Sequence, residues 1–211
     1  MSERKADYLL FDLSQQIFDI IAPEESVRQI SFSHPRTTDF INALADNENV
    51  VDAIRFLAVA INKRQSIWWA LVVNERFEAT KDQVNPVELK AWSLVREWVY
   101  SPTEANRVAA YEAAEALDFQ TAGSYAALAV FWSGGNILPP HSQEILLPPP
   151  QLCCSAVGAS ILLTCADGPA TDTPGRQREA VKIGLGIASG NTGLGSGGSG
   201  NDDAKAQSRD H

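Results

Sequence analysis

Apolar residues recur at three- and four-residue steps along most of the chain, which is the spacing of an amphipathic helix. Pro23 ends the first such run, because proline disfavours helical backbone at the residue before it. The stretch from Glu24 to Arg36 is less periodic. In the first half of the chain, the pattern predicts helices over residues 7–21, 37–45, 50–62 and 64–77.

Helix-start and helix-stop signals define the elements of the second half. Asn85 and Pro86 open a helix that runs to Tyr100, since asparagine is a good N-cap and proline suits the first turn. Pro102 and Glu104 likewise open the alanine-rich run EANRVAAYEAAEAL, whose small side chains allow close helix packing. Further helices are predicted over residues 121–132, 152–166 and 176–188.

Two segments depart from the helical pattern. Five prolines between Asn136 and Gln151 preclude a regular helix, so we expect an extended, partly polyproline crossover laid over the surface. After Ser189 the chain is rich in glycine and serine and has no apolar periodicity. We therefore expect a single helical domain over residues 1–189 and a disordered Gly/Ser-rich tail over residues 190–211.

About eight helices with short connections and no strand pattern predict an all-α fold. Short connections make neighbouring helices antiparallel. No clean repeat period is present, which favours a compact array of about eight short antiparallel helices over a solenoid.

Charge and hydropathy exclude several classes of function. The net charge of −9 and a pI of about 4.8 argue against nucleic-acid binding, which needs a cationic face. The N-terminus lacks the features of a secretory signal. The longest weakly polar run, residues 152–166, is shorter than the roughly 20 residues of a membrane helix. We expect a cytoplasmic protein with no membrane insertion.

The three cysteines all lie in that same run. Cys153, Cys154 and Cys165 are expected to be small buried hydrophobes in a reducing compartment. Adjacent cysteines point to different faces of a helix, and no histidine stands at a ligand-like spacing. The sequence therefore predicts neither a metal site nor a cofactor.

The stretch KRQSIWWALVV, residues 63–73, sets two tryptophans side by side behind a basic pair. Successive helical residues lie about 100° apart in projection, so Trp68 and Trp69 cannot face the same way. We expect one ring in the core and the other against a second neighbour or at the surface. Arg64, four residues before Trp68, can stack on that ring.

A second candidate is FWSGGNILPP, residues 131–140, which has two interpretations. Its aromatic pair, glycines and proline pair could form a peptide-docking groove, or they could end one helix and route the chain to the next. The candidate protein-binding residues of the two stretches are Arg64, Trp68, Trp69, Trp132, Gly134, Gly135, Pro139 and Pro140.

Catalytic motifs find little support. His141 stands alone in a proline-rich loop, and Ser133 does not lie in the Gly-x-Ser-x-Gly pattern of a nucleophile elbow. The glycines at 184 and 186 follow a helical pattern and lack the Gly-Lys-Ser/Thr of a phosphate loop. We identify no catalytic residue and expect the protein not to be an enzyme.

Three segments together resemble an uncharacterised family of small helical proteobacterial proteins. They are KRQSIWWA at 63–70, EWVYSPTEANRVAAYEAAEAL at 97–117, and ALAVFWSGGNILPP at 127–140 with the prolines at 148–150. A late Gly-x-x-Ile-Ala-x-Gly element matches Gly184 to Gly190. The resemblance spans about residues 50–190, and Asn62 replaces a proline often seen before the basic pair.

Genes of the family that the chain resembles are frequently found beside type VI secretion genes. The resemblance implies a non-enzymatic accessory protein that binds an effector, spike or adaptor component of that system. One alternative is an immunity protein that neutralises a toxin, and another is an enzyme whose site is assembled from distant segments. The oligomeric state stays open.

Overall fold

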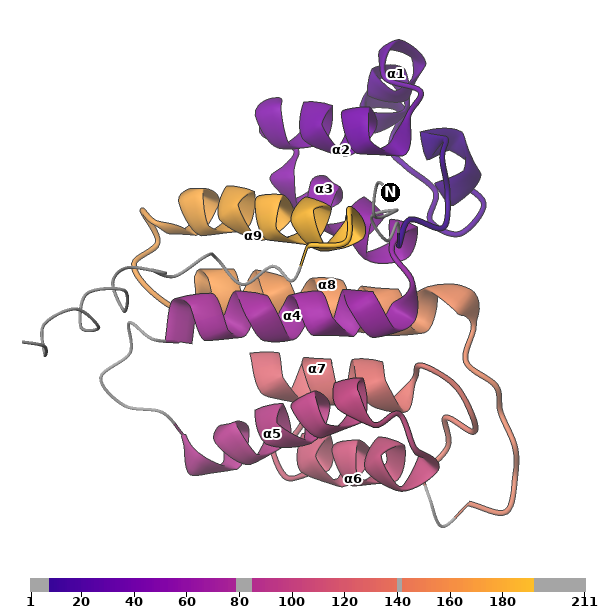
Figure 1. The fold of residues 1–211 in the computed structure, drawn as a ribbon, viewed down its shortest axis with the longest axis vertical. Coiled ribbons are helices and arrows are strands. Elements are labelled where there is room, and N and C mark those ends of the chain that lie inside the picture. Colours follow the sequence, from indigo (N-terminus) through magenta and orange to yellow (C-terminus); the bar gives the residue numbers. More distant parts are fainter. Residues whose placement is uncertain (1–7, 79–84, 140–141, 192–211) are drawn as a thin grey trace, which may run out of the picture.

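The computed structural model describes residues 8–78, 85–139 and 142–191 (Figure 1). Within these ranges every regular element is helical, which confirms the predicted all-α class. Pro140 and the predicted tail from residue 192 lie outside the described residues. The elements are η1 (Ser14–Ile17), α1 (Glu25–Ser33), α2 (Thr37–Asp46), α3 (Val50–Ala60), α4 (Lys63–Glu78), α5 (Pro86–Tyr100), α6 (Glu104–Glu115), α7 (Ala122–Phe131), α8 (Pro150–Ala166) and α9 (Thr173–Ala188).

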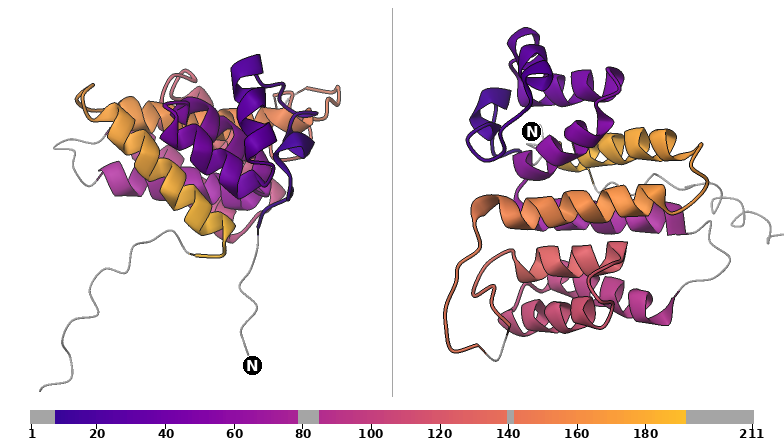
Figure 2. Two further views of the ribbon diagram at one scale, coloured as in Figure 1. Left: turned by 90° about the horizontal axis from the view of Figure 1, so that it is seen from above. Right: turned by 180° about the vertical axis from the view of Figure 1, so that it is seen from behind.

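The helices stack in tiers along the long axis of the molecule. In Figures 1 and 2, α1 and α2 lie at one end, α4 and α8 run through the middle, and α5, α6 and α7 form the other end. Helix α8 packs against α7, α4, α3 and α9, and α7 packs against α5 and α6. The proline-rich crossover passes from α7 to α8 along one edge of the lower tiers (Figure 1).

The core is continuous from the first tier to the last. Near the N-terminal end, Phe40 and Phe56 meet edge to face with their ring centroids 5.3 Å apart, and Phe18 contacts both rings. Edge-to-face pairs of this kind add about 0.5–1.5 kcal/mol beyond the burial of area. The N-terminal helices are thereby fixed to α3.

Trp69 of α4 lies in the core against α9. Its ring is fully buried, and its Nε1–H donates to the carbonyl oxygen of Ala180 in α9 at 2.7 Å. The expectation that one tryptophan of the pair lies in the core is confirmed. Gly184 lies one turn further along α9, and a Cβ there would stand 2.6 Å from Cε2 of Trp69. Glycine lets α9 pack directly on the indole ring.

The predicted helix over residues 7–21 is wrong for the part that the structure describes. Leu9 and Leu13 instead form isolated antiparallel bridges, and only η1 is helical. The amide of Tyr8 donates to Ala188 at the end of α9, and that of Leu10 donates to Ala60 at the end of α3. The last carbonyls of a helix lack partners within it. Here the N-terminal segment supplies those partners, so tertiary pairing overrides the helical spacing.

Other boundaries differ by a few residues from those expected. Helix α1 falls in the stretch whose periodicity is weak, and it buries only Val27 and Ser31. Helices α8 and α9 begin two and three residues earlier than predicted, each with a proline in its first turn. Proline is tolerated there because the amide it lacks would have no helical partner.

The three cysteines are buried and free, as expected for small hydrophobes. Burial raises the pKa of Cys153 and Cys154, and it raises the pKa of Cys165 to about 12. A thiol with such a pKa is protonated at neutral pH and is a poor nucleophile. Separately, among the helices that the structure describes, none has the length and apolarity needed to span a bilayer.

Candidate functional site

The three segments that carry the family resemblance meet at one end of the lower helices. Lys63, the first residue of α4, donates from Nζ to the carbonyl oxygen of Ser133 at 2.8 Å. Arg64 donates from Nε to the carbonyl oxygen of Val99 at 2.6 Å. A cation at a helix N-terminus is ordinarily unfavourable, but both groups reach carbonyls near the C-terminal ends of neighbouring helices. The basic pair therefore joins α4 to α5 and α7.

The exposed aromatic of this region is Tyr100 and not a tryptophan. Trp68 is half-buried and meets Tyr100 edge to face at 6.0 Å, while Tyr100 is 66% exposed. Trp132 ends α7 as its C-cap residue and packs, half-buried, against the core. The predicted tryptophans thus contribute mainly to packing.

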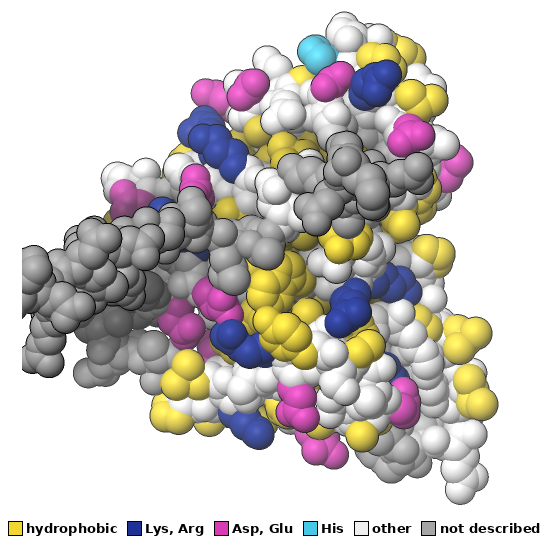
Figure 3. Space-filling model, in the orientation of Figure 1, with side chains coloured by type: hydrophobic (Ala, Val, Ile, Leu, Met, Phe, Trp, Pro, Cys, Tyr) yellow, Lys and Arg dark blue, Asp and Glu magenta, His cyan; other side chains and the backbone are white. Residues whose placement is uncertain are grey.

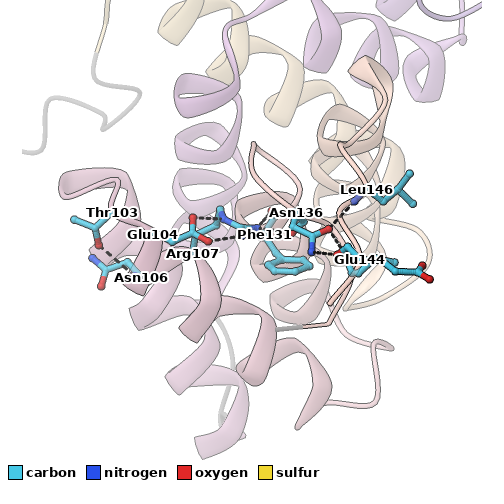
Figure 4. Close-up of polar contacts among 9 residues, drawn as sticks. Thr103, Glu104, Asn106, Arg107, Phe131, Asn136, Glu144 and Leu146 are labelled. Atoms are coloured by element: carbon cyan, nitrogen blue, oxygen red, sulfur yellow. Dashed lines mark hydrogen bonds and ion pairs between the residues drawn. The ribbon is translucent and has the colours of Figure 1, made fainter. Parts of the chain in front are cut away.

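Arg107 in α6 is the most deeply buried charged residue that the structure describes, with 6% of its surface exposed. Its Nε and Nη2 donate to the two carboxylate oxygens of Glu104, and its Nη1 donates to the carbonyl oxygens of Phe131 and Asn136 (Figure 4). The guanidinium also lies 4.6 Å from the centroid of the Phe131 ring. A bidentate carboxylate, two carbonyls and an aromatic face together compensate for the buried charge.

The sequence around Thr103 explains how this ion pair forms. Thr103 is the N-cap of α6, and its side-chain oxygen accepts from the amide of Asn106 at 3.2 Å. The Asn106 side chain in turn donates to the carbonyl oxygen of Ser101 at 2.9 Å. The cap sets Glu104 in the first turn and Arg107 three residues later, on the same helix face.

The glycine pair after α7 allows the chain to pass close to Arg107. Gly135 has a positive φ of 65°, and a Cβ there would lie 2.9 Å from Nη2 of Arg107. A side chain at Gly134 would meet nothing within 4 Å. The carbonyl of Pro139 accepts from the amide of Ser142 at 2.8 Å. Gly135 fits the interpretation that this stretch ends one helix and leads the chain to the next. Pro140 lies outside the described residues.

Asn136 connects the buried arginine to an exposed segment. Its Oδ1 accepts from the amide of Leu146 at 2.8 Å, and its Nδ2 donates to the carbonyl oxygen of Glu144 at 2.7 Å. The amide of Ile137 adds a bond to the carbonyl oxygen of Leu146 at 2.9 Å. We name residues 144–147 the apolar loop; Asn136 and Ile137 fix its backbone.

The apolar loop presents three consecutive hydrophobic side chains to solvent. Ile145 is 80% exposed, Leu146 is 52% exposed and Leu147 is 68% exposed. Hydrophobic side chains stand out at the right-hand edge of the molecule in Figure 3, along the path that the crossover follows in Figure 1. A fixed backbone under exposed apolar side chains is typical of a docking surface.

Sequence reasoning did not single out Arg107, Asn136 or the apolar loop. Arg107 and Asn136 are 29 positions apart in the sequence, and no local pattern reveals that they meet. The loop did carry a signal, because Ile145, Leu146 and Leu147 form an apolar run in a segment already predicted to lie on the surface.

A second candidate surface lies on the outer side of α8. Two adjoining hollows share Ala159 and Leu162, and the more enclosed one, of about 200 Å³, is lined by residues of α3 and α8 and by Ile21. The other lies between α8 and Tyr125 of α7. Among the described residues no cluster of three or more His, Cys, Asp or Glu side chains could hold a metal ion. Most of the residues that line the two hollows are apolar.

The ion pair between Glu104 and Arg107 makes the stability of the fold depend on pH. Hydrogen bonding from Arg107 lowers the pKa of the Glu104 carboxyl below its usual value of 4.5. A carboxyl with a lowered folded-state pKa stabilises the protein above its unfolded pKa, and this contribution is lost as the pH falls through the folded pKa. We expect Glu104→Gln to cost about 1 kcal/mol at pH 7, since the carboxylate is largely exposed.

Urea unfolding at pH 7 and at pH 3 measures this effect. The difference in unfolding free energy between the wild type and Glu104→Gln should be smaller at pH 3, below the usual carboxyl pKa of 4.5, because the stabilisation from the ionised Glu104 carboxylate is lost as the pH falls. Glu112→Gln, an exposed substitution in the middle of the same helix, is the matched control. A gap of equal size at both pH values would contradict the assignment of the ion pair.

Comparison with known proteins identifies the family without assigning an activity. No curated protein and no solved structure matches the chain. The model of a family of unknown function, DUF6931, matches residues 40–188, which include α3 to α9 and therefore Arg107 with all its hydrogen-bond partners. The expectation of an uncharacterised family is confirmed at this level. The chain therefore belongs to the family of unknown function DUF6931.

Proposed function

We propose that this protein is a non-enzymatic interaction protein that binds an effector, spike or adaptor component of a bacterial type VI secretion system, with the apolar loop as its docking surface. The link to secretion is supported by the family resemblance of residues 63–70, 97–117 and 127–140. The observation that carries the docking role is the exposure of Ile145, Leu146 and Leu147 on a backbone held by Asn136.

The energetics of the apolar loop favour a partner. Burying one Ile or Leu side chain contributes about 1.5–3 kcal/mol, so three such side chains supply a substantial part of a micromolar interaction. Binding usually costs additional free energy to order the segment that binds. Asn136 and Ile137 already fix the loop in the free protein, which reduces that cost.

Affinity capture from a strain that carries the secretion cluster tests this proposal. The double variant Ile145→Ser/Leu147→Ser should capture at least about tenfold less partner, which corresponds to about 1.4 kcal/mol. Its melting temperature should stay within about 2 °C of the wild type, because exposed substitutions rarely exceed 0.5 kcal/mol.

The matched control is Val87→Ser/Leu89→Ser, which removes two exposed apolar side chains from α5. This variant should capture the partner as well as the wild type does. Two outcomes count against the proposal: equal capture by the loop variant, or recovery of no secretion component by the wild type at low salt.

A further inference from the structure

The two edges of the apolar loop differ in their hydrogen bonding. The N–H and C=O of Leu146 both turn inward, to Asn136 Oδ1 and to the amide of Ile137. Residues 145–149 contain neither helix nor turn. In extended backbone, the polar groups of successive residues point to opposite edges. An extended backbone over these residues, with Leu146 turned inward, places the polar groups of Ile145 and Leu147 on the outward edge.

This outward edge has no partner within the part of the chain that the structure describes. No hydrogen bond there engages the backbone N–H or C=O of Ile145 or Leu147. Both side chains are also mostly exposed. When one edge of an extended segment is hydrogen-bonded and the other is not, the free edge is a template with which another strand can pair.

We propose that the apolar loop binds its partner by β-strand addition, in which one extended peptide segment of the partner pairs with the outward edge of Ile145 and Leu147. This inference rests on the docking role proposed above and specifies how docking occurs. The backbone groups of the two residues supply the ladder bonds. The side chains of Ile145 and Leu147 line one face of the pair, and Leu146 lines the other.

The surrounding residues define the chemistry of that strand. Glu144 begins the loop and is exposed, no Lys or Arg occurs from residue 136 to residue 150, and the chain carries a net charge of −9. These charges favour a strand with a Lys or Arg opposite Glu144 and disfavour an acidic one. The prolines at 148–150 have no N–H groups, so the ladder ends at Leu147. The partner segment is therefore short, apolar at alternate positions and basic at one end.

Selection from a displayed library of random octapeptides, with the full chain as target, tests this inference. We expect enriched peptides that alternate apolar residues and carry a Lys or Arg at one end. Glu144→Lys should shift the enrichment toward acidic ends, while the neighbouring surface change Gln143→Ala should leave it unchanged. Enrichment of no peptide, or of peptides with a helical apolar spacing, would overturn strand addition.

An N-methyl scan of one selected peptide provides the decisive readout. Methylation removes one backbone N–H and leaves the side chains in place. Affinity should fall at least about tenfold at every second position of the segment that pairs, because only alternate amides face the loop. Ile145→Pro should weaken binding similarly, and it breaks no hydrogen bond that the structure describes.

A scan without this alternation overturns strand addition. The docking role is judged separately, by the capture experiment with Ile145→Ser/Leu147→Ser. Reduced capture by that variant together with a flat N-methyl scan would retain the loop as a docking surface that acts through side chains alone. Undiminished capture would remove the docking role itself.

Discussion

Replacing Arg107 with alanine is expected to lower the free energy of unfolding by about 3–5 kcal/mol. The substitution empties a buried site and leaves the carbonyls of Phe131 and Asn136 without their donor. Each buried acceptor left unsatisfied costs about 1–3 kcal/mol. Arg107→Lys should lie between alanine and wild type, since an ammonium keeps the charge but cannot match both carboxylate oxygens of Glu104.

Urea denaturation followed by circular dichroism measures these differences. Arg76→Ala is the matched control, because Arg76 and its partner Glu179 are both well exposed. Its loss should cost less than about 1 kcal/mol. An Arg107→Ala variant no less stable than Arg76→Ala would show that the buried arginine does not hold α6, α7 and the crossover together.

The second large effect is expected at Gly184. A methyl group there would lie 2.6 Å from Cε2 of Trp69 and 2.7 Å from Cδ2 of Leu57, both fully buried. Trp69 cannot easily yield, because its Nε1–H is bonded to Ala180 on the same helix α9. Gly184→Ala should therefore destabilise the protein by about 1–3 kcal/mol despite the better helix propensity of alanine.

Gly158→Ala is the matched control for this prediction. Gly158 is also a buried helical glycine, in α8, but a Cβ there would meet nothing within 4 Å. Its replacement should stabilise the protein by about 0.5–1 kcal/mol through helix propensity alone. Thermal unfolding of both variants gives the comparison. Changes of the same sign in the two variants would contradict the described contact between α9 and Trp69.

Local signals predicted the helical elements of the second half well. Helix α5 begins after Asn85, whose side chain accepts from the amide of Val87, and it ends at Tyr100 as expected. The prediction of a helix in the N-terminal segment failed, because the apolar spacing there is helical while the backbone amides donate to the ends of α3 and α9. Such a competition is decided by tertiary neighbours, which are not visible in a window of sequence.

The candidate site was predicted only in outline. The basic pair, the tryptophans and the glycine stretch do meet in space, but Lys63, Arg64 and Gly135 serve mainly to join helices. The exposed segment for which we propose the docking role, the apolar loop, lies a few residues further on, where Asn136 holds its backbone. The backbone of the loop is held by the Asn136 side chain, which accepts a hydrogen bond from the Leu146 amide ten residues later. Secondary-structure propensity does not reveal such a contact.

The buried and exposed parts of the site depend on one another. Arg107 donates hydrogen bonds both to the Glu104 carboxylate and to the carbonyl oxygen of Asn136. The Asn136 side chain then fixes Glu144 and Leu146 (Figure 4). The buried Arg107 guanidinium is thus linked through Asn136 to an exposed apolar surface, and the proposed docking role rests on that link.

Hydrogen–deuterium exchange of the full chain, with and without the captured partner, tests the docking surface most directly. In the free protein the outward amides of Ile145 and Leu147 should exchange quickly, because they lack protein acceptors in the described structure. On binding, exchange over residues 142–147 should slow, while exchange over residues 155–163 on the outer side of α8 should stay unchanged. Slowing confined to residues 155–163, with none over 142–147, would contradict the account.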